Sequence, residues 1–369
     1  MKLKRKILYG LGAVIIVGIS ALMITLSHES PCPLAPALAA GVESMRAVTQ
    51  RCYGAPGKVL AIERLARPTP GKGEVLIKVR AASVNPFEWH MITGKPYFMR
   101  LGTGLGAPDE VRVGYDMAGT IEAVGPGVTH FKVGDEVFGG APGALAEYAV
   151  AAEDGDLVLK PPTVSFDDAA SLLIAGGTAL QSVRDYGHVA RGQKVLINGA
   201  SGGVGTYAVQ LAKSFGVEVT AVCSTRNVEL VRSLGADHVV DYTKEDFTAS
   251  KVQYDLIVDN VGNRPYLDLK RVVKPKGTIV TVSGPKDNAF LGPMTRIIKQ
   301  KMLAPFIDQH LVFFVANVGV PDLEFLVGLL RDGKMKAVID RRYPLEDAGA
   351  ALDYIGSQRA RGKVIVTVD

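Results

Sequence analysis

The chain has 369 residues, of which 47% are hydrophobic and 21% charged, which is enough to build the cores of two globular domains. The net charge is +5, and Lys2, Lys4, Arg5 and Lys6 account for most of it, so the rest of the chain is close to neutral. Nothing in this balance indicates a protein that binds nucleic acid, and we expect no nucleic-acid partner.

An uncharged and mostly apolar run covers residues 7–26, directly after these cations. As a helix it would span about 30 Å, the thickness of a bilayer's hydrocarbon core. We therefore predict an N-terminal transmembrane helix within residues 1–26 and a single-pass membrane localisation, with the side of the membrane left open. A cleaved signal peptide, with Ala37-Leu-Ala39 as its cleavage site, is the alternative. Residues 27–44 are predicted to be a proline-rich linker.

Short strand patterns separated by turn residues follow over residues 45–165. Gly125-Pro-Gly127 and Gly134-Asp135 mark two of these turns, and the pattern predicts a β-rich domain. The end of the chain, residues 334–369, shows two more strand patterns around a helical one. We expect this last segment to return and complete the β-rich domain.

Residues 166–333 contain strands that alternate with helices, which predicts a doubly wound α/β sheet with its ligand at the carboxyl ends of the strands. The strand Val195-Leu-Ile197 runs into Ala200-Ser-Gly-Gly-Val-Gly205 and then into a helix. Small residues in this turn would let a pyrophosphate reach backbone N–H groups at the helix N-terminus. We predict a dinucleotide site here, formed by Ala200, Ser201, Gly202, Gly203, Val204 and Gly205. A purely structural tight turn is the alternative.

The end of the next strand separates the two nicotinamide cofactors. A site for NAD carries Asp or Glu there, and this chain carries Cys223, followed by Ser224 and Arg226. A hydroxyl and a guanidinium suit a 2′-phosphate, so we predict NADP(H) as the cofactor. The alternative is that Arg226 is an ordinary solvated loop charge.

Several further motifs lie along the same span, and together they carry a family resemblance. They are Ser83-Val-Asn-Pro-Phe-Glu-Trp89, Gly114-Tyr-Asp-Met-Ala-Gly119, Val124-Gly-Pro-Gly127, Phe131-Lys-Val-Gly-Asp-Glu-Val137, Leu234-Gly-Ala-Asp-His238 and Gly362-Lys-Val-Ile-Val366. From about Met45 to Asp369 the chain resembles the zinc-independent, quinone oxidoreductase-like members of the medium-chain dehydrogenase/reductase superfamily. The resemblance implies a GroES-like catalytic domain (45–165, completed by 334–369) and a Rossmann domain (166–333).

The resemblance also implies further site residues. Cofactor contacts are expected from Thr178, Tyr242, Val261, Gly262, Ser283 and Lys363. Asn85 and Tyr115 match two positions that hold catalytic zinc in metal-dependent relatives, and neither is a good zinc ligand. Because the three cysteines, Cys32, Cys52 and Cys223, also lack metal-ligand spacing, we expect no metal. The run His310–Val315 resembles an edge strand that forms a homodimer.

A metal-free site favours hydride transfer to an electron-poor acceptor. We therefore expect an NADPH-dependent reductase of quinones or α,β-unsaturated carbonyls, in which the Asn85 amide and the Tyr115 hydroxyl stabilise the developing oxyanion. Tyr115 as an ordinary half-buried tyrosine stays open. So do an alcohol or aldehyde reductase and a membrane-tethered NADPH-binding interaction protein. For residues 285–306 the sequence allows a cap on the substrate pocket, a membrane-surface segment or a core helix.

Overall fold

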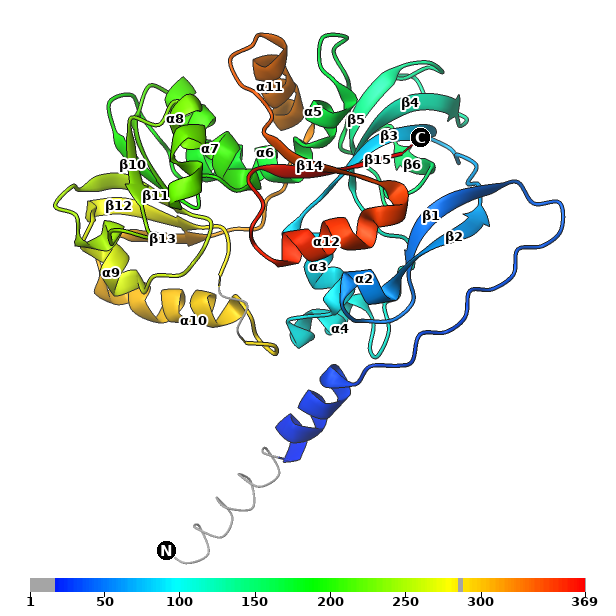
Figure 1. The fold of residues 1–369 in the computed structure, drawn as a ribbon, viewed down its shortest axis with the longest axis horizontal. Coiled ribbons are helices and arrows are strands. Elements are labelled where there is room, and N and C mark those ends of the chain that lie inside the picture. Colours follow the sequence, from blue (N-terminus) through cyan, green and yellow to red (C-terminus); the bar gives the residue numbers. More distant parts are fainter. Residues whose placement is uncertain (1–16, 285–287, 369) are drawn as a thin grey trace, which may run out of the picture.

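The structure is a computed structural model that describes residues 17–284 and 288–368. Two bodies lie side by side, each built on its own β-sheet, and a helix at the N-terminal end projects away from both of them (Figure 1). The chain is an α/β protein with one Rossmann-like and one GroES-like body.

The Rossmann-like body contains a six-stranded sheet in the order β10-β9-β8-β11-β12-β13, and all of its strand pairs are parallel. Its strands are β8 (Lys194–Asn198), β9 (Glu218–Cys223), β10 (His238–Asp241), β11 (Tyr254–Asp259), β12 (Val273–Thr281) and β13 (His310–Phe313). Val195, Leu196 and Ile197 of β8 are fully buried, as expected for a parallel strand covered on both faces. The strand order reverses between β8 and β11, where such sheets bind ligands.

Helices cover both faces of this sheet. They are α6 (Leu173–Leu180), α7 (Gly203–Ser214), α8 (Val228–Ser233), α9 (Tyr266–Lys270) and α10 (Met294–Leu303). Helix α11 (Val320–Arg331) packs against α6, whereas α5 (Phe166–Ala170) packs on the sheet of the GroES-like body. Strand β13 lies at the edge of the sheet. A homodimer formed through this edge stays a prediction.

The GroES-like body contains a sheet in the order β14-β15-β3-β4-β5-β7, with β6 also paired to β3. Its strands are β3 (Glu74–Val84), β4 (Asp116–Val124), β5 (Glu136–Gly140), β6 (Tyr148–Ala152), β7 (Leu157–Leu159), β14 (Ile339–Pro344) and β15 (Lys363–Thr367). Strand β15 pairs antiparallel with β3 in the register Val364↔Val84, so the end of the chain lies beside the strand that leads to Asn85. A hairpin of β1 (Ser44–Gln50) and β2 (Leu60–Ala66) and the helices α2 (Pro56–Val59), α3 (Pro86–Thr93), α4 (Arg100–Thr103) and α12 (Ala348–Gly356) complete this body.

The prediction of a transmembrane helix is wrong, and the membrane localisation inferred from it is withdrawn. Within residues 17–284 and 288–368, no helix combines the length and the apolar character that crossing a bilayer requires. Residues 17–27 are helical, which corresponds to about 16 Å, whereas the hydrocarbon core is about 30 Å thick. Residues 7–16 of the predicted span lie outside the described residues.

Candidate functional site

The glycine-rich turn between β8 and α7 has the geometry expected of a phosphate-binding turn. An added Cβ at Gly205 would lie 2.1 Å from the Gly199 carbonyl oxygen, so only glycine lets α7 approach the end of β8 this closely. At Gly202, which precedes the first residue of α7, a Cβ would meet only that same oxygen, at 3.6 Å. Space is therefore open in front of the helix N-terminus, where unpaired N–H groups and the helix dipole favour an anion.

Asn227 ties this turn to the loop after β9. Its amide nitrogen donates to Ser201 Oγ at 2.9 Å and to Ser224 Oγ at 3.2 Å. Arg226, beside it, is exposed, and its guanidinium donates to the Arg359 carbonyl oxygen of the GroES-like body at 2.8 Å. Both predicted 2′-phosphate ligands thus belong to one loop that adjoins the glycine-rich turn.

Asp241, at the end of β10, puts a carboxylate near this loop, and its Cα pairs with Cys223. The carboxylate accepts hydrogen bonds from the hydroxyl groups of Thr225 and Thr243. These bonds, the one from Thr225 first, lower the pKa of Asp241 to about 2. Tyr242 follows it with 47% of its surface exposed, so its ring is free to contact a ligand.

Carboxyl-terminal strand ends of the Rossmann-like sheet converge around Asp259. This fully buried carboxylate accepts from Asn198 at 2.8 Å and from the Gly262 N–H at 2.9 Å. Gly262 has a φ of 72°, and a Cβ there would lie 2.7 Å from the Ser283 carbonyl oxygen. The ends of β11 and β12 approach this closely because residue 262 has no side chain.

Helix α10 is anchored to this cluster from inside the protein. Arg296 is buried, and its guanidinium donates to Asp259 at 2.5 Å and to the Gly262 carbonyl oxygen at 2.9 Å. It also stacks on the Tyr266 ring, with 4.4 Å to the centroid. Three alternatives were open for residues 285–306. The core helix fits the side of α10 that carries Arg296.

A buried polar cluster surrounds Asn85, which caps the N-terminus of α3. The Asn85 amide nitrogen donates to Asp116 Oδ2 at 3.1 Å, and the Asn85 side-chain oxygen accepts from the Lys363 ammonium. Asp116 also accepts from the Ser83 hydroxyl at 3.0 Å. The Asn85 backbone N–H donates to the Glu88 carboxylate at 2.9 Å, which completes a capping box. Asn85, Glu88, Asp116 and Lys363 are each at most 5% exposed.

Burial sets the protonation of this cluster. It raises the pKa of Glu88 to about 7, with the nearby Asp116 charge as the second cause. Burial likewise raises the pKa of Asp116 and lowers that of Lys363, because each charged form loses its water. Glu88 Oε1 and Asp116 Oδ1 have no hydrogen-bond partner among the described residues. The site therefore holds more carboxyl oxygens than it has donors, and protonation of one carboxyl relieves the imbalance.

Lys363 joins this cluster to the glycine-rich turn. A Cβ at Gly203 would lie 3.3 Å from Lys363 Cδ, so the lysine stem runs past the start of α7 while its ammonium reaches Asn85. Helix α6 reaches the same place, since the Ile174 N–H donates to Asp116 at 3.4 Å. Thr178 lies one helical turn further along this face of α6.

Tyr115 is oriented differently from Asn85. Its hydroxyl donates to Asp156 at 3.3 Å, and its half-buried ring lies against Gly140. Burial, and then the Asp156 charge, raise the pKa of Tyr115. This carboxylate contact leaves both readings of Tyr115 as predictions.

Two family models match the chain. Residues 71–162 match the alcohol dehydrogenase GroES-like domain, and residues 234–366 match the zinc-binding dehydrogenase model. The chain is 35% identical over 341 residues to the chloroplastic quinone-oxidoreductase QR1 of Triphysaria versicolor, covering 87% of this chain and 98% of that protein. It is 33% identical over 336 residues to 2-methylene-furan-3-one reductase of Solanum lycopersicum, covering 87% and 79%. The solved quinone oxidoreductase of Coxiella burnetii superposes with a TM-score of 0.77 at 31% identity, covering 89% of this chain and all of that one.

The chain belongs to the medium-chain dehydrogenase/reductase family. It is an NAD(P)H-dependent oxidoreductase.

This medium-chain dehydrogenase/reductase contains site residues beyond the predicted ones. Glu88 and Asp116 stand inside quoted motifs, where the sequence indicates only that they brace the loop around Asn85 and Tyr115. Asn227 and Asp241 had no comparable signal, because the spacing of neither residue indicates a contact with the turn or with Thr225. Cys32 and Cys52 form a disulfide, with their Cα atoms 4.8 Å apart, which the sequence analysis did not predict.

In this family, metal-dependent members need a set of metal ligands that the described part of the chain does not supply. Residues 17–284 and 288–368 contain no group of three or more His, Cys, Asp or Glu side chains arranged to hold a metal ion. Cys223 is buried and free, and the other two cysteines are paired. Asn85 matches a position that holds catalytic zinc in metal-dependent relatives. Its side-chain oxygen already accepts a hydrogen bond from the Lys363 ammonium, and the positive charge of that group would repel a metal cation.

Proposed function

We propose that the chain transfers a hydride from NADPH to a quinone or an α,β-unsaturated carbonyl, without zinc. The observation that carries the proposal is the Asn85 amide, held between Lys363 and Asp116 where the GroES-like body meets the glycine-rich turn. The named relatives, a quinone oxidoreductase and a furanone reductase, support this class of acceptor. The domain division into 45–165 with 334–369 and 166–333 is part of the same proposal.

The hydrogen bonds of Asn85 define which end of its side chain donates. The Lys363 ammonium can only donate, so it must face the amide oxygen, and this turns the amide nitrogen toward Asp116. One N–H of that nitrogen is used by Asp116. In this proposal the second N–H donates to the acceptor oxygen on which negative charge develops, and the two partners hold the amide in place.

A bound nicotinamide would supply the hydride. The chain's own part is to hold the cofactor phosphates at the start of α7, to place the nicotinamide side near Val261, Gly262 and Ser283, and to present the Asn85 amide. Tyr115 is the second candidate donor in this proposal. Zinc takes no part in it, because the donor set around Asn85 does not suit the metal.

The preference for NADPH rests on Ser224 and Arg226, which offer a hydroxyl and a guanidinium to a 2′-phosphate. Asp241 is a nearby carboxylate that could disfavour the phosphate. Its oxygens are occupied by Thr225 and Thr243, and Lys244 Nζ lies 3.6 Å away, which reduces its effect on a ligand.

The test is an acceptor screen with the full chain, in which oxidation of NADPH or NADH is followed by absorbance. We expect turnover of quinones or enones with NADPH, and a loss of kcat of about 10²–10³-fold in Asn85→Ala, the usual effect of removing an oxyanion donor. Tyr115→Phe is the comparison variant for the second donor. Cofactor binding without turnover of any acceptor would overturn the proposal and favour an interaction protein.

A further inference from the structure

We propose that residues 26–32 form a brace that positions residues 93–106, the segment that follows the Asn85 helix and contacts the Rossmann-like body, with Arg100 as the positioning residue. The proposal rests on the proposed function and extends it to a segment outside both matched family models, whose matches begin at residue 71. Residues 28–39 have no regular secondary structure, yet three kinds of contact fasten this segment to the GroES-like body.

The first contact is a buried guanidinium at the end of the N-terminal helix. Arg100 is 0% exposed, and its Nη1 donates to the carbonyl oxygens of Leu26 at 3.1 Å and His28 at 2.9 Å. Its Nη2 donates to the Glu29 carboxylate at 3.0 Å. The last carbonyls of a helix lack partners within the helix, and a cation there is favourable, so Arg100 caps residues 17–27 from outside.

The same guanidinium also holds the end of α3, the helix that begins beside Asn85. Arg100 Nε donates to the Gly94 carbonyl oxygen at 2.9 Å. Its plane stacks on the rings of Tyr53 and Tyr97, with 4.3 Å and 4.6 Å to the centroids. The Arg100 side chain therefore connects the N-terminal segment to Gly94, at the end of α3.

The second contact is a disulfide, and the third is a backbone hydrogen bond. Cys32 is joined to Cys52 by a disulfide, and the neighbouring Tyr53 hydroxyl donates to the Gly104 carbonyl oxygen at 2.9 Å. The Ser30 N–H donates to the Gly106 carbonyl oxygen at 2.9 Å. The brace thus contacts residues 93–106 directly at Arg100 and Gly106, and through Cys52 and its neighbour Tyr53 at Gly104.

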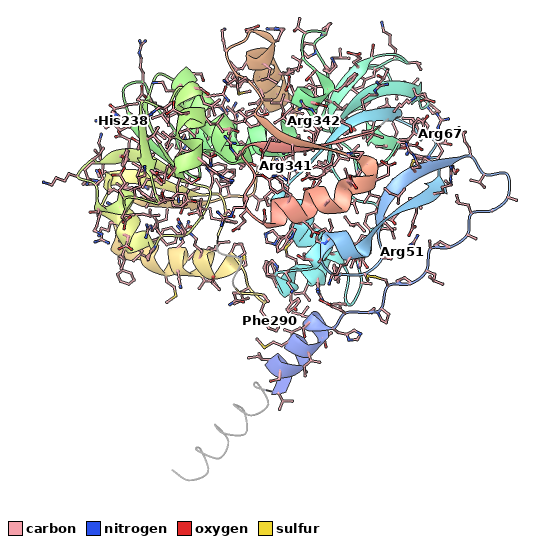
Figure 2. All side chains as sticks on the ribbon, in the orientation of Figure 1. Arg51, Arg67, His238, Phe290, Arg341 and Arg342 are labelled. Carbon is pink, nitrogen blue, oxygen red and sulfur yellow. A yellow bond between two sulfur atoms is a disulfide. The ribbon has the colours of Figure 1, made fainter. Side chains whose placement is uncertain are left out.

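Residues 93–106 reach across to the Rossmann-like body. The Tyr97 N–H donates to the Ala289 carbonyl oxygen at 2.7 Å, and the Tyr97 and Phe290 rings meet edge to face with 5.1 Å between centroids. Figure 2 labels Phe290 in the region between the two bodies. In the GroES-like body, Tyr97 follows α3, the helix that starts beside Asn85, and in the Rossmann-like body Phe290 follows Ser283 in sequence. The contact therefore links the two bodies through segments that continue from predicted site residues, and the brace determines the position of the Tyr97 side.

The test compares Arg100→Met with wild type and with Arg232→Met, an exposed arginine on α8. We expect the acceptor KM of Arg100→Met to rise about tenfold while the NADPH KM stays within twofold, because the glycine-rich turn lies on the other body. Hydrogen exchange should increase in residues 93–106 and 288–292 and stay unchanged in β8 and α7. Arg232→Met should match wild type in all of these measurements.

Two further variants keep the test decisive. If Arg100→Met does not fold, Glu29→Gln and Cys32→Ser each remove one contact of the brace, and the same local rise in exchange is expected, at smaller size. An unchanged acceptor KM, or a rise in exchange spread evenly over both bodies, would overturn the proposal. If the wild type reduces no acceptor, the proposed function fails, and the exchange pattern alone still decides whether the brace holds residues 93–106.

Discussion

Replacing Gly202 with alanine would separate cofactor binding from folding. Gly202 has a φ of −83°, which alanine adopts without strain, and its added Cβ would contact only the Gly199 carbonyl oxygen at 3.6 Å. The methyl group therefore fits the protein itself. It would occupy the open space in front of α7, where we predict that the pyrophosphate binds.

The two expected free-energy changes can be worked out separately. Alanine is a poorer N-cap than glycine by up to about 1 kcal/mol, and it regains about 0.4–1 kcal/mol by restricting the unfolded chain, so stability should change by no more than about 1 kcal/mol. Blocking one hydrogen bond from a backbone N–H to a charged phosphate costs about 1.5–3 kcal/mol. The Kd for NADPH should therefore rise about 10- to 150-fold.

Urea unfolding and NADPH titration by calorimetry measure these two quantities, and Gly205→Ala is the matched control. There the Cβ would lie 2.1 Å from the Gly199 carbonyl oxygen and 2.7 Å from Ala200 Cα, so α7 must shift. We expect this control to lose about 1–3 kcal/mol of stability. Wild-type NADPH affinity in Gly202→Ala would refute the assignment of the phosphate site to this turn.

Three other variants test the rest of the site. Lys363→Met removes the cation from a buried pair, so the free energy of unfolding in urea should fall by about 3–5 kcal/mol at pH 7 and recover partly at pH 5, where the carboxyls gain protons. An unchanged stability would show that the ammonium is not needed there. Arg226→Ala should raise the Kd for NADPH about 10- to 100-fold and leave the Kd for NADH within twofold, by calorimetric titration; equal losses for both cofactors would contradict its role at the 2′-phosphate. Burial raises the pKa of Glu88 from 4.5 to about 7, so folding favours its protonated form. The stability that the protonated form contributes is fully present below pH 4.5 and is lost as the pH rises through 7. Between pH 5 and 8, wild type should therefore lose up to about 3 kcal/mol more stability than Glu88→Gln, which keeps an acceptor for the Asn85 N–H; parallel stability curves would refute this.

Local sequence patterns were sufficient to predict the Rossmann-like body. The apolar run of β8, the small residues of the turn and the amphipathic α7 are contiguous, and each constrains the next through a short loop. The close contact at Gly205 follows from the same local geometry. The expected role of Ser224 and Arg226 used only their position after β9, and it still awaits the binding test above.

The uncharged N-terminal run shows where such patterns mislead. Its composition matches a membrane span, whereas no helix that the structure describes is long and apolar enough to be one. The described helix covers residues 17–27, Leu26 is 6% exposed, and Arg100 caps the end of that helix from a site 74 residues away from Leu26 in sequence. That contact depends on the fold of the GroES-like body, which no N-terminal pattern encodes.

By itself, the sequence determined the parts of this protein that depend on neighbours along the chain: the strand-turn-helix unit, the alternation of strands and helices, and the absence of a carboxylate at Cys223. Tertiary structure alone decided that Lys363 reaches Asn85, 278 residues earlier, and that Asp116 faces both. The physical reason is that β15 enters the sheet beside β3, and the resulting burial removes water from charged groups that would titrate normally in a loop.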